Sequence, residues 1–292
     1  MIERTDTTLK SDSGKSLFLT IFDDWRVGRF LMFILITGSI TYGLGGSWLA
    51  VAFSSIIGLT LSISGFYLDY LFDYKKDIES GKISNPIARG TFTFKLAVIT
   101  VVIALIVSIT LGALVNPWVL IPMVVVMLVI IGLGFGILDS PFLRAISLGL
   151  LQGLYVLIGA FAAEQYSIGV WYIALFLFFA MTGGRAMGDT RDLPHDVKTN
   201  TMTIPKKFGV RIASIFLLIN ELIAYTFGFL VYFSGILNIR FLYCMIVLSS
   251  LGFVLSLIFA IKPTPKVAYF TNMFSFMLLG LLFVLGMILG KL

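Results

Sequence analysis

Long apolar stretches, separated by short polar or turn-forming segments, run through nearly the whole chain. A helix needs about 20 apolar residues to cross a bilayer. The stretches that approach this length cover residues 27–46, 48–68, 93–114, 118–138, 144–163, 167–185, 210–234, 241–261 and 268–290. Residues typical of turns stand between several of them, for example Gly45-Gly46 and Asn116-Pro117. The pattern predicts an all-α, polytopic membrane protein with nine transmembrane helices.

The composition excludes an ordinary soluble domain. Of the 292 residues, 59% are hydrophobic and 12% are charged, whereas soluble domains carry about 25% charged residues. Residues 1–26 are polar, and their apolar run at 17–22 is too short for the core of a signal peptide. We therefore expect a cytoplasmic N-terminal tail over 1–26 and one transmembrane domain over 27–292. Cys244 is the only cysteine, which excludes a disulfide within the chain.

The positive charges test this topology independently. If the N-terminus is inside, all but two of the 21 lysines and arginines fall in inside segments, the exceptions being Arg240 and Lys291. This distribution agrees with the positive-inside rule. It predicts a cell-membrane protein whose long connections, 69–92 and 186–209, are cytoplasmic. The formal net charge of +6 then follows from membrane orientation, without nucleic acid as a partner.

Six of the 15 acidic residues form two clusters at the ends of apolar stretches. The two clusters are Asp69, Asp73 and Asp77, and Asp189, Asp192 and Asp196. Spacings of i, i+4, i+8 and i, i+3, i+7 put the carboxylates of each cluster on one face of a helix. Carboxylates this close repel one another unless a cation neutralises them. Because Mg²⁺ is typically held by a few carboxylates and substrate phosphate, the pattern predicts a Mg²⁺–phosphate site.

Other interpretations of the charged residues stay open at this point. The aspartates could be solvated loop charges, but two clusters on one predicted side, each flanked by cations, favour a functional role. Glu221, next to Asn220, lies within a predicted span and could line a substrate cavity or make a contact between helices. His195 could tune Asp196, act as a base, or be a solvated loop residue. The alternative function is a secondary transporter with ion-coupling carboxylates, although transporters favour charges near the midplane.

The residues around both clusters resemble the motifs of the UbiA superfamily of intramembrane prenyltransferases. The first segment reads Asp69-Tyr-Leu-Phe-Asp73-Tyr-Lys-Lys-Asp77 and continues to Asn85-Pro-Ile-Ala-Arg-Gly90. The second reads Asp189-Thr-Arg-Asp192-Leu-Pro-His-Asp196, followed by Thr203-Ile-Pro205. The family's motifs are Asn-(Asp)-x-x-Asp-x-x-x-Asp with a Pro-Ile-x-Arg-Gly-like segment, and Asp-x-x-Asp-x-x-x-Asp with Thr-Leu-Pro. The departures from the family pattern include Asp69, Tyr70 and Leu138, which stands where tyrosine is usual.

The resemblance implies nine helices around a central cavity and a Mg²⁺-dependent reaction. A prenyl group would pass from a prenyl diphosphate to a lipophilic acceptor, such as a quinone precursor or an isoprenoid lipid. All six aspartates are then expected to be metal ligands, and the expected catalytic residues among them are Asp73, Asp77, Asp192 and Asp196. The expected diphosphate-binding residues are Lys82, Arg89, Arg144 and Lys198. The cavity wall would include Asn220 and Glu221, and membrane lipid would surround the helices.

Overall fold

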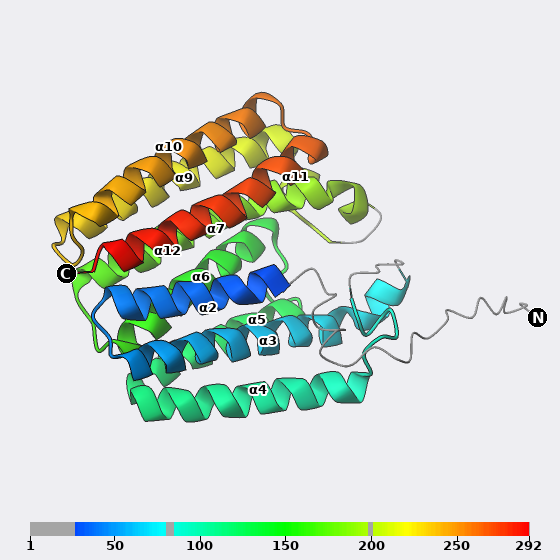
Figure 1. Cartoon of the computed structure of the whole chain (residues 1–292). Coiled ribbons are helices and arrows are strands. Elements are labelled where there is room, and N and C mark those ends of the chain that lie inside the picture. Colours follow the sequence, from blue (N-terminus) through cyan, green and yellow to red (C-terminus); the bar gives the residue numbers. More distant parts are fainter. Residues whose placement is uncertain (1–26, 80–84, 198–200, 292) are drawn as a thin grey trace, which may run out of the picture.

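The computed structural model of the chain describes residues 27–79, 85–197 and 201–291, and it is helical throughout, with no strand in these ranges (Figure 1). In chain order the elements are α2 (Val27–Gly43), α3 (Trp48–Glu79), α4 (Phe94–Val115), η1 (Pro117–Val119), α5 (Leu120–Gly134), α6 (Pro141–Ala162), α7 (Ile168–Asp196), α8 (Ile204–Phe208), α9 (Val210–Phe233), α10 (Ile239–Ile261), α11 (Pro265–Phe274), η2 (Ser275–Leu279) and α12 (Gly280–Leu289). Helices α2, α3 and α4 lie side by side and run in alternating directions (Figure 1). The fold is therefore a multi-helix bundle in which helices that follow one another in sequence are antiparallel.

The prediction of an all-α, multi-pass membrane protein is confirmed. Within the described residues, eight helices are long and apolar enough to cross a membrane. The remaining predicted span, 27–46, corresponds to α2, whose apolar part, Phe30–Gly43, is shorter. The last span is composite, because α11 and α12 are joined by the π-helical segment η2. The count of nine is therefore approximately right.

Two predicted boundaries were wrong in the same way. We placed the ends of two spans at residues 68 and 185, but α3 continues to Glu79 and α7 to Asp196. Hydropathy reports where lipid contact ends, whereas a helix ends where capping or a helix-breaking residue stops it. The charged residues of both segments do not break a helix. Both aspartate clusters consequently lie on rigid helical extensions and not in loops.

Helix α6 lies at the centre of the bundle. In its apolar window 72% of the residues are buried, compared with 22% for α4. Its neighbours include α2, α5 and α7. Most side chains exposed on the outer helices are large and apolar, such as Ile103 and Ile106 on α4, as expected for surfaces that face lipid tails. The arrangement explains why α6 carries several glycines, since small residues let helices approach closely in a membrane.

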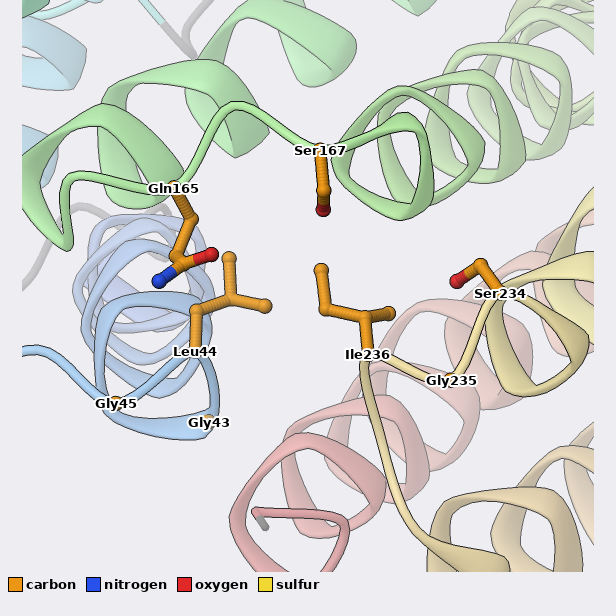
Figure 2. A pocket seen from close by; sticks show the side chains of 8 residues that line it. All are labelled: Gly43, Leu44, Gly45, Gln165, Ser167, Ser234, Gly235 and Ile236. Atoms are coloured by element: carbon orange, nitrogen blue, oxygen red, sulfur yellow. The ribbon is translucent and has the colours of Figure 1, made fainter.

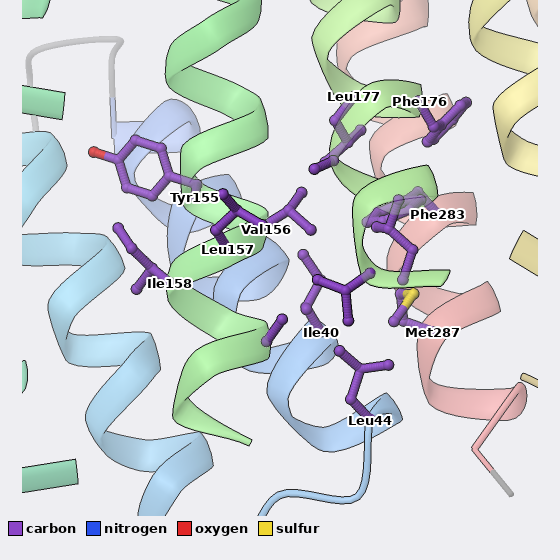
Figure 3. Packing of buried hydrophobic residues seen from close by; sticks show 14 of the residues in the cluster. Ile40, Leu44, Tyr155, Val156, Leu157, Ile158, Phe176, Leu177, Phe283 and Met287 are labelled. Atoms are coloured by element: carbon purple, nitrogen blue, oxygen red, sulfur yellow. The ribbon is translucent and has the colours of Figure 1, made fainter. Parts of the chain in front are cut away.

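Apolar side chains pack tightly in the half of the bundle far from the aspartate clusters. Figure 3 shows this core, to which α2, α6, α7 and α12 contribute. Its labelled members include Ile40, Leu44, Leu157, Phe176 and Met287. Leu44 and Met287 lie at the C-terminal ends of α2 and α12. These ends are on the opposite side of the bundle from the C-terminal ends of α3 and α7. This largest cluster therefore joins the helices at the end away from the aspartates, while smaller apolar clusters pack nearer to the ends of α3 and α7.

The contact between α6 and α7 predicts a clear effect for Gly149→Ala. A methyl group at Gly149 would collide with the backbone oxygen of Phe178 and the hydroxyl of Thr182 on α7. Because backbone cannot move aside cheaply, we expect a loss of about 1–3 kcal/mol of stability, measured as thermal unfolding in detergent. Gly184→Ala is the matched control, since its methyl group would meet nothing within 4 Å. Equal unfolding temperatures for the two variants would contradict this account of the packing.

Candidate functional site

The two aspartate clusters lie at the same end of the bundle, which we call the aspartate end. It consists of the C-terminal ends of α3 and α7 and the segments that follow them (Figure 1). A hydrogen bond joins the two parts, because Lys76 Nζ on α3 donates to Thr201 Oγ1, just beyond α7, at 3.1 Å. Two groups of carboxylates far apart in sequence therefore share one side of the membrane domain.

The three carboxylates of the first cluster differ in exposure. Asp69 is exposed, Asp73 is half-buried and Asp77 is only 5% exposed. An α-helix turns by about 100° per residue, so a step of four residues rotates the side chain by about 40°. Along α3 the cluster thus turns progressively from the surface towards the interior. The three carboxylates spread over about 80° of the helix surface, so the prediction that they share one face is only approximately right.

Asn85 holds the buried end of this cluster in place. Its Nδ2 group donates to Asp77 Oδ2 at 2.9 Å and to the backbone oxygen of Tyr70 at 3.1 Å. Its Oδ1 atom accepts from the backbone N–H of Ile87 at 2.9 Å and of Ala88 at 3.3 Å. One fully buried amide therefore connects the end of α3 to the turn that carries the Pro-Ile-Ala-Arg-Gly sequence.

The second cluster follows the helix geometry closely. Asp189 and Asp196, seven residues apart, are separated by only about 20° around α7, and both are buried. Asp192 lies about 60° away from Asp189 and is half-buried. The same helix thus turns two carboxylates inward and leaves the third half-exposed.

Arginines pair with two of these carboxylates. Arg185 Nε lies 2.6 Å from Asp189 Oδ1, and the Asp189 side chain is only 3% exposed. Arg191 donates to both oxygens of Asp192, at 2.7 and 2.6 Å. A planar guanidinium suits such two-point binding of a carboxylate. The arginines therefore neutralise charges that would otherwise repel one another.

Asp196 ends the helix in a partly desolvated position. Burial raises the pKa of its carboxyl above the usual range, the negative charges of Asp189 and Asp192 raise the pKa further, and Arg185 opposes the change. Lys206 Nζ donates to the backbone oxygen of Asp196 at 2.7 Å, which satisfies a carbonyl at the end of α7. A cation bound nearby would favour the ionised carboxylate.

The four cations predicted to bind diphosphate have different positions. Arg144, at the start of α6, pairs with Asp139 at 2.6 Å, and its positive charge opposes the rise in the pKa of the Asp196 carboxyl. Arg89 is exposed and makes a long contact, 3.4 Å, with Thr91 Oγ1. Lys82 and Lys198 lie outside the described residues, as does the side chain of His195. Of the four predicted diphosphate-binding residues, the structure therefore describes only Arg144 and Arg89, and both lie at the aspartate end.

Asn220 and Glu221 are buried between helices. Asn220 packs against Gly183 of α7 and donates to the backbone oxygen of Phe216 at 2.8 Å. Glu221 is 7% exposed and lies beside Tyr225 and Ser256 of α9 and α10. Its Oε2 atom has no hydrogen-bond partner among the described residues. The two neighbours in sequence consequently face different helices, and their role in a cavity wall stays a prediction.

Two hollows of the described surface lie away from the aspartate end. Figure 2 shows one of about 360 Å³, lined by residues of the loops after α2, α6 and α9. The side chains of Gln165, Ser167 and Ser234 line this hollow (Figure 2). The second hollow has an apolar lining that includes Tyr42 and Trp48. The central cavity implied by the resemblance therefore stays a prediction.

The donor chemistry of the aspartate end fits Mg²⁺. All six aspartates offer hard oxygen ligands, which this ion prefers, and it usually keeps waters or substrate phosphate as further ligands. Within the described part of the chain, no three acidic, histidine or cysteine side chains converge on one point. A Mg²⁺ ion held by the described side chains would therefore also use waters or phosphate oxygens as ligands.

Two residues of the site were not predicted from the sequence. Arg185 precedes Asp189 by four residues on one helix, a spacing that indicates an ion pair, so its role could have been predicted. Asn85 lies eight residues beyond Asp77 and past the end of α3. No helical spacing links them, because the return of the chain brings them together.

The ion pair between Arg185 and Asp189 predicts a stability effect. Arg185→Ala leaves a buried carboxylate without its partner, which costs about 3 kcal/mol, the low end of the usual range, because the guanidinium is partly exposed. We expect a lower unfolding temperature in detergent with EDTA present, so that no metal replaces the arginine. Adding Asp189→Asn should recover part of the loss. A double variant less stable than Arg185→Ala would contradict the pairing as the cause.

Comparisons with known proteins point to one family. The model of the UbiA prenyltransferase family matches residues 30–279. A digeranylgeranylglyceryl phosphate synthase from Methanosphaera stadtmanae is 25% identical over 204 residues, which cover 70% of this chain and 74% of that protein. A solved structure of a digeranylgeranylglyceryl phosphate synthase has a TM-score of 0.74 at 19% identity, covering 94% of this chain and 98% of that one. A UbiA homologue from Archaeoglobus fulgidus bound to GPP and Mg²⁺ has a TM-score of 0.67 at 16% identity, covering 90% and 95%. The solved structures share their fold with this chain.

Proposed function

Because the chain belongs to the UbiA prenyltransferase family and is a prenyltransferase, we propose that it transfers a prenyl group from a prenyl diphosphate to a lipophilic acceptor in a Mg²⁺-dependent reaction. The observation that carries this proposal is the position of two carboxylate clusters at one end of a membrane-spanning bundle. A prenyl diphosphate has an anionic head and an apolar tail, and this end offers metal-binding oxygens next to apolar helices. The UbiA homologue bound to GPP and Mg²⁺ supports the same chemistry.

The residues of the aspartate end have separate tasks in this proposal. Asp73, Asp77, Asp192 and Asp196 would hold Mg²⁺, with Asp69 and Asp189 as further ligands. The ion would neutralise charge on the diphosphate and so make it a better leaving group. The Arg144 and Arg89 guanidinium groups would bind phosphate oxygens that remain. These residues thus hold the diphosphate at one place while the prenyl chain lies among apolar side chains.

Bond cleavage then follows from charge stabilisation. The carbon–oxygen bond breaks, and the electron pair leaves with the diphosphate. The acceptor atom donates an electron pair to the allylic carbon, and its proton passes to solvent water. Preorganised positive charge stabilises the leaving group without reorganisation during the reaction. In this proposal the protein contributes positioning and electrostatics, and no covalent intermediate is needed.

For the acceptor we propose a lipophilic molecule, and a glyceryl phosphate that carries one prenyl ether chain is the first to test. Two similar proteins are named as digeranylgeranylglyceryl phosphate synthases, which favours this choice over a quinone precursor. We also propose that the aspartate end faces the cytoplasm of a cell membrane, since the positive-inside rule gives this orientation. The diphosphate would then be supplied and released on the cytoplasmic side.

The experiment uses the purified full chain in detergent with geranylgeranyl diphosphate and Mg²⁺. Candidate acceptors are added one at a time, and diphosphate release and prenylated product are measured. We expect both to require the acceptor and to appear in equal amounts. A secondary transporter would release no diphosphate, so the absence of release with every acceptor class would favour that alternative.

A further inference from the structure

We propose that Asn85 is a positioning residue for the first aspartate cluster: it orients the Asp77 carboxylate and fixes the turn that carries Arg89 at a set distance from it. This inference rests on the proposed function, because it assigns Asn85 a task in metal and diphosphate binding. The residue itself is fully buried and is not a candidate for contact with substrate. It would act only through Asp77 and the turn.

Every donor and acceptor of the Asn85 side-chain amide takes part in a hydrogen bond. A primary amide has two N–H donors and an oxygen that accepts two bonds. Here both donors are used, towards Asp77 and the Tyr70 carbonyl, and the oxygen accepts from Ile87 and Ala88. The backbone oxygen of Asn85 also accepts from the N–H of Arg89 at 3.0 Å. One residue therefore links helix, carboxylate and turn, and any rotation of the amide would break several bonds at once.

Apolar packing fixes the same turn from the other side. Ile87 and Phe92 are buried in a cluster with Tyr67 and Tyr70 of α3. The Tyr67 and Phe92 rings have centroids 5.0 Å apart. Because the turn is held by these contacts as well, the loss of one Asn85 bond need not unfold it. The bond to Asp77 can therefore be tested separately from the fold.

In two other asparagines the side-chain oxygen accepts the same kind of backbone hydrogen bond, but the side-chain nitrogen donates to different groups. Asn116 and Asn238 each accept, through Oδ1, from the N–H two residues further on, at 3.1 and 2.9 Å. Their Nδ2 groups donate to neutral oxygens: those of Phe161 and Tyr166 for Asn116, and backbone oxygens near the C-terminus for Asn238. Both lie at the far end of the bundle. Of these three, Asn85 alone donates to a carboxylate, which is where a hydrogen bond has most effect on a metal ligand.

The central experiment compares Asn85→Ser with Asn116→Ser in the full chain. Serine caps a turn about as well as asparagine, but it is too short to reach Asp77. We expect Asn85→Ser to raise the Mg²⁺ concentration for half-maximal turnover by roughly 10- to 100-fold. Mn²⁺ binding in the presence of geranyl diphosphate should weaken by a similar factor. It is measured as the decrease in the electron paramagnetic resonance signal of free Mn²⁺. Asn116→Ser should change only thermal stability.

A double variant separates positioning from general damage. If Asn85 acts through Asp77, Asn85→Ser should weaken Mn²⁺ binding no further in an Asp77→Asn background. Should Asn85→Ser not be recovered in folded form, Asn85→Gln keeps the amide but displaces it by one methylene, and the same shift in Mg²⁺ dependence is expected. Unchanged Mg²⁺ and Mn²⁺ affinities in the folded variant, or an equal shift in Asn116→Ser, would overturn the inference. Failure of the wild-type protein to bind Mn²⁺ or to turn over would instead count against the proposed function.

Discussion

Changing Asp73 or Asp192 to asparagine is expected to reduce prenyl transfer about a thousandfold. Both residues are half-buried at the aspartate end, one on α3 and one on α7. Asparagine keeps the size of the side chain but removes the negative charge that binds a divalent cation. Loss of metal-stabilised charge on the leaving diphosphate is worth about 4 kcal/mol, which corresponds to about a thousandfold in rate. The measurement is the turnover of geranylgeranyl diphosphate at saturating Mg²⁺.

A carboxylate at the other end of the bundle provides the control. Glu164 is exposed in the loop between α6 and α7, so Glu164→Gln should retain wild-type turnover. Thermal unfolding of all three variants should stay close to that of the wild type, since Asp73 and Asp192 are not part of the apolar core. Near-normal activity in either aspartate variant would remove that carboxylate from the proposed metal site. Loss of activity in only one of them would restrict the site to a single cluster.

Removal of divalent cations is expected to stop turnover completely and reversibly. EDTA should reduce diphosphate release to the rate without protein, and excess Mg²⁺ should restore it. Mn²⁺ should also restore it, because it accepts the same oxygen ligands, whereas Ca²⁺ should do so poorly, since it is larger and takes more ligands. Turnover is measured before chelation, after it and after each addition. Full activity in EDTA would contradict a metal-dependent reaction.

The fold could be predicted in outline because helices that span a membrane are apolar whether they face lipid or, like α6, other helices. Every predicted span has a helix, even though α2 is short and the last span contains a π-helical segment. The ends of α3 and α7 could not be predicted from hydropathy, because the helices extend beyond the apolar stretch. Once the extension of α3 is known, the change from exposed Asp69 to buried Asp77 follows from the pitch of the helix.

The sequence predicted which residues form the site better than it predicted the contacts between them. The six aspartates stand out by spacing, and the pair of Arg185 and Asp189 follows the same rule. The bond from Asn85 to Asp77 depends on where the chain returns after α3, which no local pattern encodes. The same applies to Lys76 and Thr201, which belong to the two halves of the site. Long-range contacts of this kind need the three-dimensional structure.

The dense apolar packing around Ile40, Leu44 and Met287 has an electrical consequence. An ion that reached the carboxylates from the aqueous phase would meet a dry region of low permittivity beyond them, where an unpaired charge costs several kcal/mol. Protein interiors are generally close-packed and contain few voids large enough for water. If the proposed function holds, metal ions and diphosphate would gather on one side of the membrane, and the apolar cluster would keep ions from leaking through the bundle to the other side.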